Sequence, residues 1–183
     1  MNTNTNLTGL PPVVSTHSRI LILGSMPGDE SLRRQQYYAH YRNAFWYIMG
    51  QICGASLDLP YQDRLIQMKL AGFALWDVLK HCQRQGSLDA KIVDETEEVN
   101  DFESFLKTYS SIQLIGLNGG KAADTLMKNV WSDLPAVIRQ RITLVRLPST
   151  SPANARLSKD EKLTIWRNKL SIDTLPSGYP TSI

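Results

Sequence analysis

Residues 19–28 read RILILGSMPG, in which a short apolar run stops at a turn rich in glycine and proline. Such a run is typical of a strand that is buried on both faces, as in a parallel sheet. Three further runs have the same form and also end at polar or turn-forming residues, namely 73–76, 112–117 and 141–147. The pattern therefore predicts four parallel strands.

Helical segments separate these runs and set the fold class. Pro60 and Gly72 bound the segment 60–71, and Ser158 with Glu161 forms a capping box at the start of 158–170. The remaining helical segments are 43–53, 100–109 with Asn100 as its cap, and 121–130. Strands that alternate with helices predict an α/β domain whose parallel sheet carries helices on both faces.

Length and composition are those of one ordinary domain. The chain has 183 residues, of which 42% are hydrophobic and 20% charged, which excludes a disordered chain and a membrane protein. We expect a mobile lead-in over 1–17, one domain over 18–170 and a loose tail over 171–183. The first residues do not resemble a signal peptide, and no apolar run approaches the ~20 residues of a membrane span. We therefore expect a cytosolic monomer, nucleoid-associated if the source is prokaryotic.

Few residues are suited to binding a metal. Cys53 and Cys82 are the only cysteines, too few for a disulfide framework or a four-thiolate zinc or iron–sulfur site. The three histidines are scattered, and no HExxH or CxxC spacing occurs. We therefore expect no metal.

Charge is unevenly distributed along a chain whose net charge is only +3. Residues 89–103 hold seven acidic side chains and one basic one, whereas 139–169 hold eight basic and two acidic ones. Further arginines, Arg33, Arg34 and Arg42, flank an aromatic segment. Charge runs usually mark solvated faces, but this asymmetry also suits an enzyme that binds and searches along DNA. On that hypothesis, the acidic stretch at 89–103 lies outside the loops that contact DNA, and the basic residues lie on one face.

Ligands of parallel sheets bind beyond the carboxyl ends of the strands. Four loops lie there: 24–28, 76–77, 118–120 and 148–154. In the first, Gly24 and Ser25 could present backbone amides to a phosphate or a base, or simply turn the chain into a helix. Gly116 to Ala122 lacks the spacing and the hydroxyl of a phosphate-binding loop, which argues against a nucleotide hydrolase.

Residues 37–47, YYAHYRNAFWY, concentrate six aromatic side chains. Phe45 and Trp46 fit the apolar face of a helix and hence the core. Tyr37, Tyr38 and Tyr41 precede that helix beside arginines, where aromatic rings can form a stacking platform for a base. The PSTSPAN segment at 148–154 is small, polar and rigid, which suits a grip on phosphates or a simple connector.

Together these loops resemble the uracil DNA glycosylase superfamily, and most closely its hypoxanthine DNA (deoxyinosine) glycosylase branch. The elements that carry the resemblance occur in family order between residues 19 and 170: ILILGSMPGDESL, QYYAHYRNAFW, ALWDVL, LIGLNGGKAA and LPSTSPANA. The HxxNxFW element and the PSTS loop also resemble mismatch-specific uracil and thymine glycosylases, so that specificity remains an alternative.

The resemblance implies a three-layer α/β/α fold with a four-stranded parallel sheet in the order 2-1-3-4. It implies no cofactor, and hydrolysis of the N-glycosidic bond of a deaminated base that is flipped out of DNA, with hypoxanthine and also uracil as candidate substrates. The residues implied to contact the base are Gly24, Ser25, Met26, Tyr38, Trp76 and Asp77. Those implied to contact DNA are Ser149, Thr150, Ser151, Ala153, Asn154 and Arg156.

Two departures from the family pattern bear on catalysis. Met26 stands where better-known branches have an Asp or Asn that orients the attacking water, so the resemblance assigns catalysis to Asn43. An alternative role for Asn43 is the N-cap of the helix that follows. Tyr41 replaces a usual Pro, which shifts the entry into that helix. Because Met26 cannot orient water as an Asp or Asn would, the protein could instead be a non-catalytic binder of nucleic acid or nucleotide.

Two alternative roles are open for Asp77. Its carboxylate could accept the N1–H of hypoxanthine, a proton that adenine lacks. The same negative charge would repel a departing anionic base, and Asp77 is then a cap or a water-binding group instead.

Overall fold

The structure is a computed structural model that describes residues 5–170. The tail expected over 171–183 lies outside the described residues. None of the described helices is long and apolar enough to cross a membrane.

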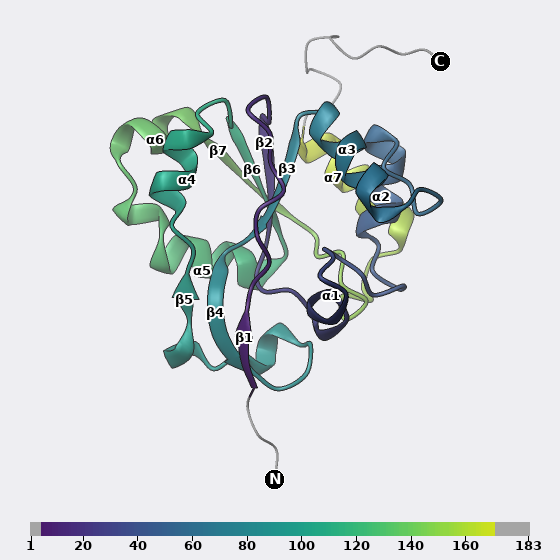
Figure 1. The fold of residues 1–183 in the computed structure, drawn as a ribbon, viewed down its shortest axis with the longest axis horizontal. Helices are drawn as coiled ribbons and strands as arrows, with labels where there is room; N and C mark the ends of the chain where they lie inside the picture. Colours follow the sequence, from purple (N-terminus) through teal and green to yellow (C-terminus); the bar gives the residue numbers. More distant parts are fainter. Residues whose placement is uncertain (1–4, 171–183) are drawn as a thin grey trace.

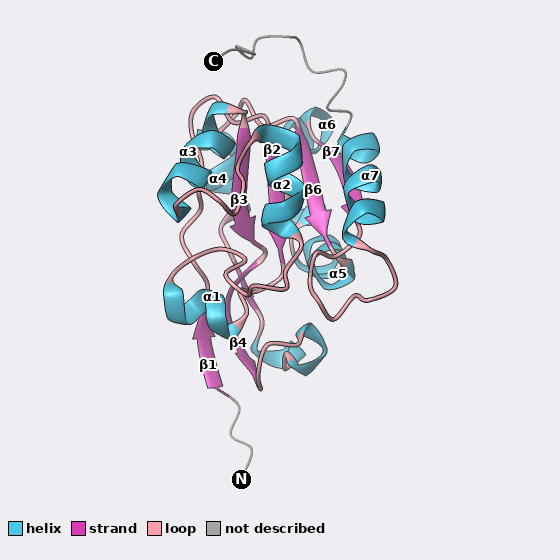
Figure 2. Ribbon diagram, turned by 90° about the vertical axis from the view of Figure 1, so that its right-hand side faces the viewer, coloured by secondary structure: helices cyan, strands magenta, loops and turns pink. Residues whose placement is uncertain are grey.

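Four parallel strands form the central sheet in the order β3 (Phe73–Asp77), β2 (Ile20–Gly24), β6 (Leu114–Asn118) and β7 (Thr143–Leu147). Numbered along the chain, this order is 2-1-3-4, which confirms the expectation. All the strands run the same way, so their carboxyl ends meet at the lower edge in Figure 2. In register, Gly24 lies opposite Asp77, which brings the first two loops together.

Helices cover both faces of the sheet (Figure 1), as the alternating pattern predicted. One layer holds α2 (Phe45–Cys53), α3 (Tyr61–Leu70) and α7 (Lys159–Leu170); the other holds α4 (Phe102–Thr108), α5 (Gly120–Asn129) and α6 (Ala136–Arg141). Each face of β2 is apolar: Leu21 and Leu23 pack in one core cluster, whereas Ile22 packs in the other. Burial on both faces explains why this strand reads as an uninterrupted apolar run.

The predicted N-terminal capping residues are confirmed for α7 and are wrong for α4. At the start of α7, the Ser158 amide donates to the Glu161 carboxylate at 2.8 Å and the Glu161 amide donates to Ser158 Oγ at 3.2 Å, which confirms the capping box. The cap of α4 is Asp101, which accepts from Ser104 N, and not Asn100. Asn100 instead donates from Nδ2 to the backbone oxygen of Asp77 at 2.8 Å.

A second, antiparallel sheet was not predicted. It consists of β1 (Thr5–Thr8), β4 (Leu79–Arg84) and β5 (Glu98–Val99), with β4 in the centre. The expected lead-in is therefore wrong for residues 5–17: β1 pairs along β4, and Val13 forms a bridge with Leu75. Because the side chains of β1 are polar, the sequence shows no apolar pattern there. The backbone of β1 nevertheless pairs with β4 and covers an edge of that strand that would otherwise be unpaired.

Short elements complete the described chain. Helix α1 (Asp29–Arg34) follows the first loop, and 3-10 turns span Asp89–Lys91, Asp94–Thr96 and Trp131–Asp133. Their brevity explains why no periodic pattern marked them in the sequence.

Candidate active site

A cavity of about 710 Å³ opens at the carboxyl ends of the parallel strands. Its wall is built by the loops after β2, β3, β6 and β7 and by the segment before α2, as the position of ligands in parallel sheets leads one to expect. The predicted site residues on this wall are Gly24, Ser25, Met26, Tyr38, Asn43, Asp77, Ser149, Thr150, Ser151, Ala153 and Asn154. The structure thus brings together segments that lie far apart in the sequence.

Trp76 and Arg156 do not belong to this wall. The Trp76 ring packs against Phe102 and Phe105, with centroid distances of 5.1 and 4.5 Å. Adjacent residues of a strand point to opposite faces, so Asp77 reaches the cavity while Trp76 enters the core beneath α4. The Trp76 ring, predicted to contact the base, therefore lies in the core and not on the cavity wall. Arg156 is exposed on the loop between β7 and α7.

Asp77 is a buried carboxyl group at the base of the cavity, with only 3% of its surface exposed. A Cβ at position 24 would lie 2.3 Å from Asp77 Oδ1, so only glycine leaves room for this carboxyl group. Asp77 Oδ2 has no hydrogen-bond partner among the described residues. Burial raises the pKa of Asp77 to about 7; the charge of Asp89 adds to the rise and Arg84 opposes it.

Asp89 reaches the same cavity from the acidic stretch. Ser25 Oγ donates to Asp89 Oδ1 at 2.7 Å, across 64 positions of sequence. The buried Arg84 donates to the Pro27 backbone oxygen at 2.7 Å and so holds the first loop onto β4. The expectation that residues 89–103 lie outside the site is thus wrong for Asp89, because the chain after β4 folds back beneath the first loop.

Tyr38 is held rigidly on the cavity wall. Its ring stacks on Phe45 with the centroids 3.9 Å apart, and Asn118 Nδ2 donates to its hydroxyl oxygen at 3.1 Å. Its backbone has φ of +53°, a left-handed conformation that costs free energy and is often found at functional sites. Burial raises the pKa of the Tyr38 hydroxyl, which therefore remains protonated at neutral pH.

Asn118 connects this aromatic ring to the loop at 148–154, a role that the sequence did not reveal. Besides Tyr38, Asn118 Nδ2 donates to Thr150 Oγ1, and the Thr150 amide donates back to Asn118 Oδ1, both at 3.0 Å. The Thr150 backbone oxygen accepts from the Ala44 amide at 3.0 Å. In the sequence, the signal for this role was the position of Asn118 at the end of the third predicted strand.

Asn43 lies half-buried on the wall, just before α2. Ala44, not Asn43, is the N-cap residue of α2. Asn43 Oδ1 accepts a hydrogen bond from the amide of Phe45, the first residue of the helix, at 3.0 Å. A carbonyl oxygen has two lone pairs, and the second remains free to accept from a water molecule. The contact of Asn43 with the start of α2 is therefore compatible with the catalytic role.

The loop at 148–154 is organised by its own side chains. Ser149 Oγ accepts from the Ser151 amide, and Ser151 Oγ accepts from the Ala153 amide, both at 3.2 Å. Each hydroxyl proton is left to donate to an outside acceptor such as a phosphate oxygen. The buried Lys162 donates to the Asn154 backbone oxygen at 2.8 Å and fixes the far end of the loop.

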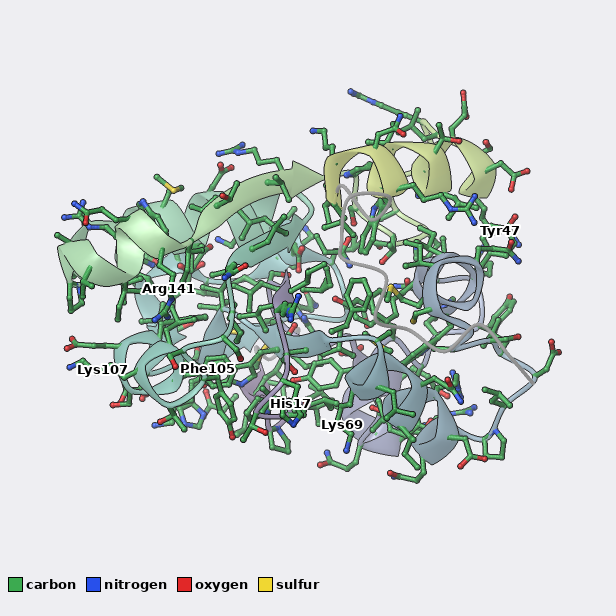
Figure 3. The ribbon with its side chains drawn as sticks, turned by 90° about the horizontal axis from the view of Figure 1, so that it is seen from above. His17, Tyr47, Lys69, Phe105, Lys107 and Arg141 are labelled. Atoms are coloured by element: carbon green, nitrogen blue, oxygen red, sulfur yellow. The ribbon has the colours of Figure 1, made fainter. Side chains whose placement is uncertain are left out.

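The basic residues do not gather on one face as the charge pattern suggested. Arg139 and Arg141 belong to α6, which precedes β7, at the edge opposite the cavity. Figure 3 looks onto that opposite edge and shows Arg141 there with Lys69 and Lys107. Among the arginines near the aromatic segment, Arg33 and Arg34 both pair with Glu30, whereas Arg42 lies on the cavity wall. The prediction of one basic face is therefore wrong.

Within residues 5–170, no group of three or more His, Cys, Asp or Glu side chains is placed to hold a metal ion.

Comparisons with known proteins agree with this geometry. A hypoxanthine DNA glycosylase of Methanosarcina acetivorans is 39% identical over 157 residues, covering 84% of this chain and 92% of the relative. A second protein of that name, from Methanosarcina barkeri, is 43% identical over 117 residues, covering 63% of this chain and 73% of the relative.

A solution NMR structure of a Methanosarcina acetivorans protein, provisionally named a uracil DNA glycosylase, matches with a TM-score of 0.72 and 36% identity. The match covers 91% of this chain and 99% of that one. The family model described as the uracil DNA glycosylase superfamily matches residues 11–170. Sequence, fold and cavity thus agree that the chain belongs to the uracil DNA glycosylase superfamily.

Proposed function

We propose that this protein is a monofunctional DNA glycosylase that removes hypoxanthine from deoxyinosine in DNA, acting as a monomer. The observation that carries the proposal is the cavity at the strand ends, where the fixed ring of Tyr38 and the buried carboxyl group of Asp77 meet. The two relatives named hypoxanthine DNA glycosylase support this choice of base.

Recognition of the base rests on Tyr38 and Asp77. One face of the Tyr38 ring is covered by Phe45, and the extruded base stacks on the other. The free Asp77 Oδ2, when ionised, accepts the N1–H of hypoxanthine. Adenine has an acceptor at N1 and is rejected, because a carboxylate offers it no proton.

Hydrolysis transfers the deoxyribose carbon C1′ from the base to water. The oxygen of a water molecule bonds to C1′ as the C1′–N9 bond breaks, and the electron pair of that bond stays with the base. The proton that the water loses passes to the solvent, and the departing base takes up a proton to leave as neutral hypoxanthine. Asn43 Oδ1 orients this water through its second lone pair, but a neutral amide does not accept the proton. Backbone amides at Gly24, Ser25 and Met26 stabilise the negative charge that develops on the base.

A single hydrolytic step fits the composition of the cavity wall. Among the described residues that line it there is no lysine, the usual nucleophile of a lyase step. Lys162, the buried lysine near the loop, is engaged with the Asn154 backbone oxygen. The protein is therefore proposed to release the base and leave an intact abasic strand.

DNA is held beside the cavity by the loop at 148–154. Extrusion of a nucleotide costs a few kcal/mol of unstacking, which contacts with the backbone must offset. The hydroxyls of Ser149 and Ser151 donate to phosphate oxygens, while Ala153 and Asn154 enter the space that the base has left. Arg156, exposed beyond them, neutralises a phosphate.

The test uses end-labelled duplexes that contain deoxyinosine, deoxyuridine or a G·T mismatch, followed by hot alkali to cut abasic strands. We expect cleavage of the deoxyinosine strand. Asn43→Ala should lose most turnover and retain DNA binding, whereas Asn168→Ala, a control at an exposed position of α7, should behave as the wild type.

Other outcomes separate the alternatives. Cleavage of only the uracil or thymine mismatch strand would assign the mismatch-specific activity instead. Tight binding of abasic DNA without any base release would favour the non-catalytic binder that Met26 suggests. Undiminished turnover of Asn43→Ala would move the orientation of the water to another group.

A further inference from the structure

Tyr41 is the most exposed large hydrophobic residue of the described chain, with 82% of its surface accessible, and the proposed mechanism does not use it. Its two neighbours in sequence, His40 and Arg42, both line the cavity. A single exposed hydrophobic side chain is common on protein surfaces. The position of Tyr41 between two residues of the cavity wall is what places its ring beside DNA bound at the cavity.

The ring of Tyr41 is held by these two neighbours. The His40 and Tyr41 centroids lie 5.0 Å apart with an interplanar angle of 18°, and the Arg42 guanidinium carbon lies 5.7 Å from the Tyr41 centroid. His40 Nδ1 also accepts from the Arg42 amide at 3.2 Å. We call these three residues the rim cluster; it joins an aromatic surface to a positive charge.

The rim cluster is continuous with the elements proposed to bind DNA. The Asn43 amide donates to the His40 backbone oxygen at 2.9 Å, and the next residue, Ala44, is bonded to Thr150. The tip of the loop at 148–154 carries only small side chains, Pro152 and Ala153. The aromatic ring of the rim cluster therefore supplies a stacking surface that this loop lacks.

We propose that Tyr41, supported by His40 and Arg42, stacks on a nucleobase that flanks the extruded nucleotide. The inference rests on the proposed function, because extrusion removes a stacking partner from each neighbouring base. An aromatic ring replaces that partner without reading sequence, and Arg42 neutralises an adjacent phosphate. The extruded base itself occupies the cavity against Tyr38, so the two rings serve different nucleotides.

The experiment uses duplexes with a tetrahydrofuran abasic analogue and 2-aminopurine at either flanking position. Flipping raises the fluorescence of an unstacked 2-aminopurine, and wild-type protein should quench it on binding. Tyr41→Ala and Tyr41→Leu should lose the quenching and bind about 5- to 150-fold more weakly, which corresponds to the ~1–3 kcal/mol lost with one base–aromatic stack. Tyr41→Phe should retain both properties.

The matched control is Val137→Ala, which also truncates an exposed hydrophobic side chain but lies on α6, away from the cavity. Wild-type quenching and affinity in both Tyr41→Ala and Tyr41→Leu would overturn the inference. Base release by the wild type is measured separately on deoxyinosine duplexes. A wild type that quenches 2-aminopurine but releases no base would refute the proposed function and leave the stacking inference supported.

Discussion

Replacement of Asp77 by asparagine tests whether burial raises the pKa of this carboxyl group. Asparagine is nearly the same shape but carries no charge, so it keeps the packing against Gly24. In the wild type, the folded state resists ionisation of Asp77, whereas the unfolded chain ionises it freely. Stability of the wild type should therefore fall as the pH rises through the interval between the two pKa values.

The magnitude follows from that interval. The pKa of Asp77 is raised from 3.8 to about 7, so the folded state binds one more proton than the unfolded chain between these values. The free energy of unfolding falls by about 1.4 kcal/mol for each pH unit, or about 4 kcal/mol in total. Below pH 4 the effect vanishes, and above pH 7 it is complete.

Urea unfolding of the wild type and Asp77→Asn between pH 4 and pH 8 measures this difference. The side-chain amide of the variant also lowers the free energy of unfolding, because it is buried without full hydrogen bonding. This loss of stability does not depend on pH. The stability of the variant relative to the wild type should thus rise by about 4 kcal/mol from pH 4 to pH 8. Parallel pH profiles for the two proteins would refute the reasoning.

Three further predictions concern the same cavity. Gly24→Ala places a methyl group 2.3 Å from Asp77 Oδ1 and should lower base release more than tenfold in a folded protein, checked by excision assays and circular dichroism. Asn118→Ala removes three hydrogen bonds to Tyr38 and Thr150 and should cost about 3 kcal/mol in urea unfolding; a loss below 1 kcal/mol would contradict it. Wild-type release of hypoxanthine should rise as the pH passes through about 7, because ionised Asp77 accepts N1–H, and the pH–rate profile of Asp77→Asn should lack this rise.

Much of the site could be predicted because its residues follow buried strands. The run at 19–23, the PSTSPAN loop and the end of β3 all carried local signals, and parallel strands place their carboxyl ends at one edge. The capping box at Ser158 is likewise local, since its partners lie within one turn. Such features depend on a few neighbouring residues and need no knowledge of the rest of the chain.

The errors arose where distant segments meet. Trp76 and Asp77 follow each other in a strand that is apolar on both sides, so the sequence pattern did not say which of them faces the cavity. Asp89 belongs to an acidic stretch that is remote in sequence from the first loop, yet it accepts a hydrogen bond from Ser25 Oγ. The polar strand β1 has no apolar pattern that would predict a strand, because what it contributes is backbone pairing with β4.

By itself, the sequence determined the class of fold, the order of its elements and the loops that carry the chemistry, because these follow from burial patterns and chain direction. Only the tertiary structure decided the ionisation of Asp77, the bridging role of Asn118 and the exposure of Tyr41 at the rim. Each of these depends on which groups surround a side chain in space, and packing brings those groups from parts of the chain that local patterns do not connect.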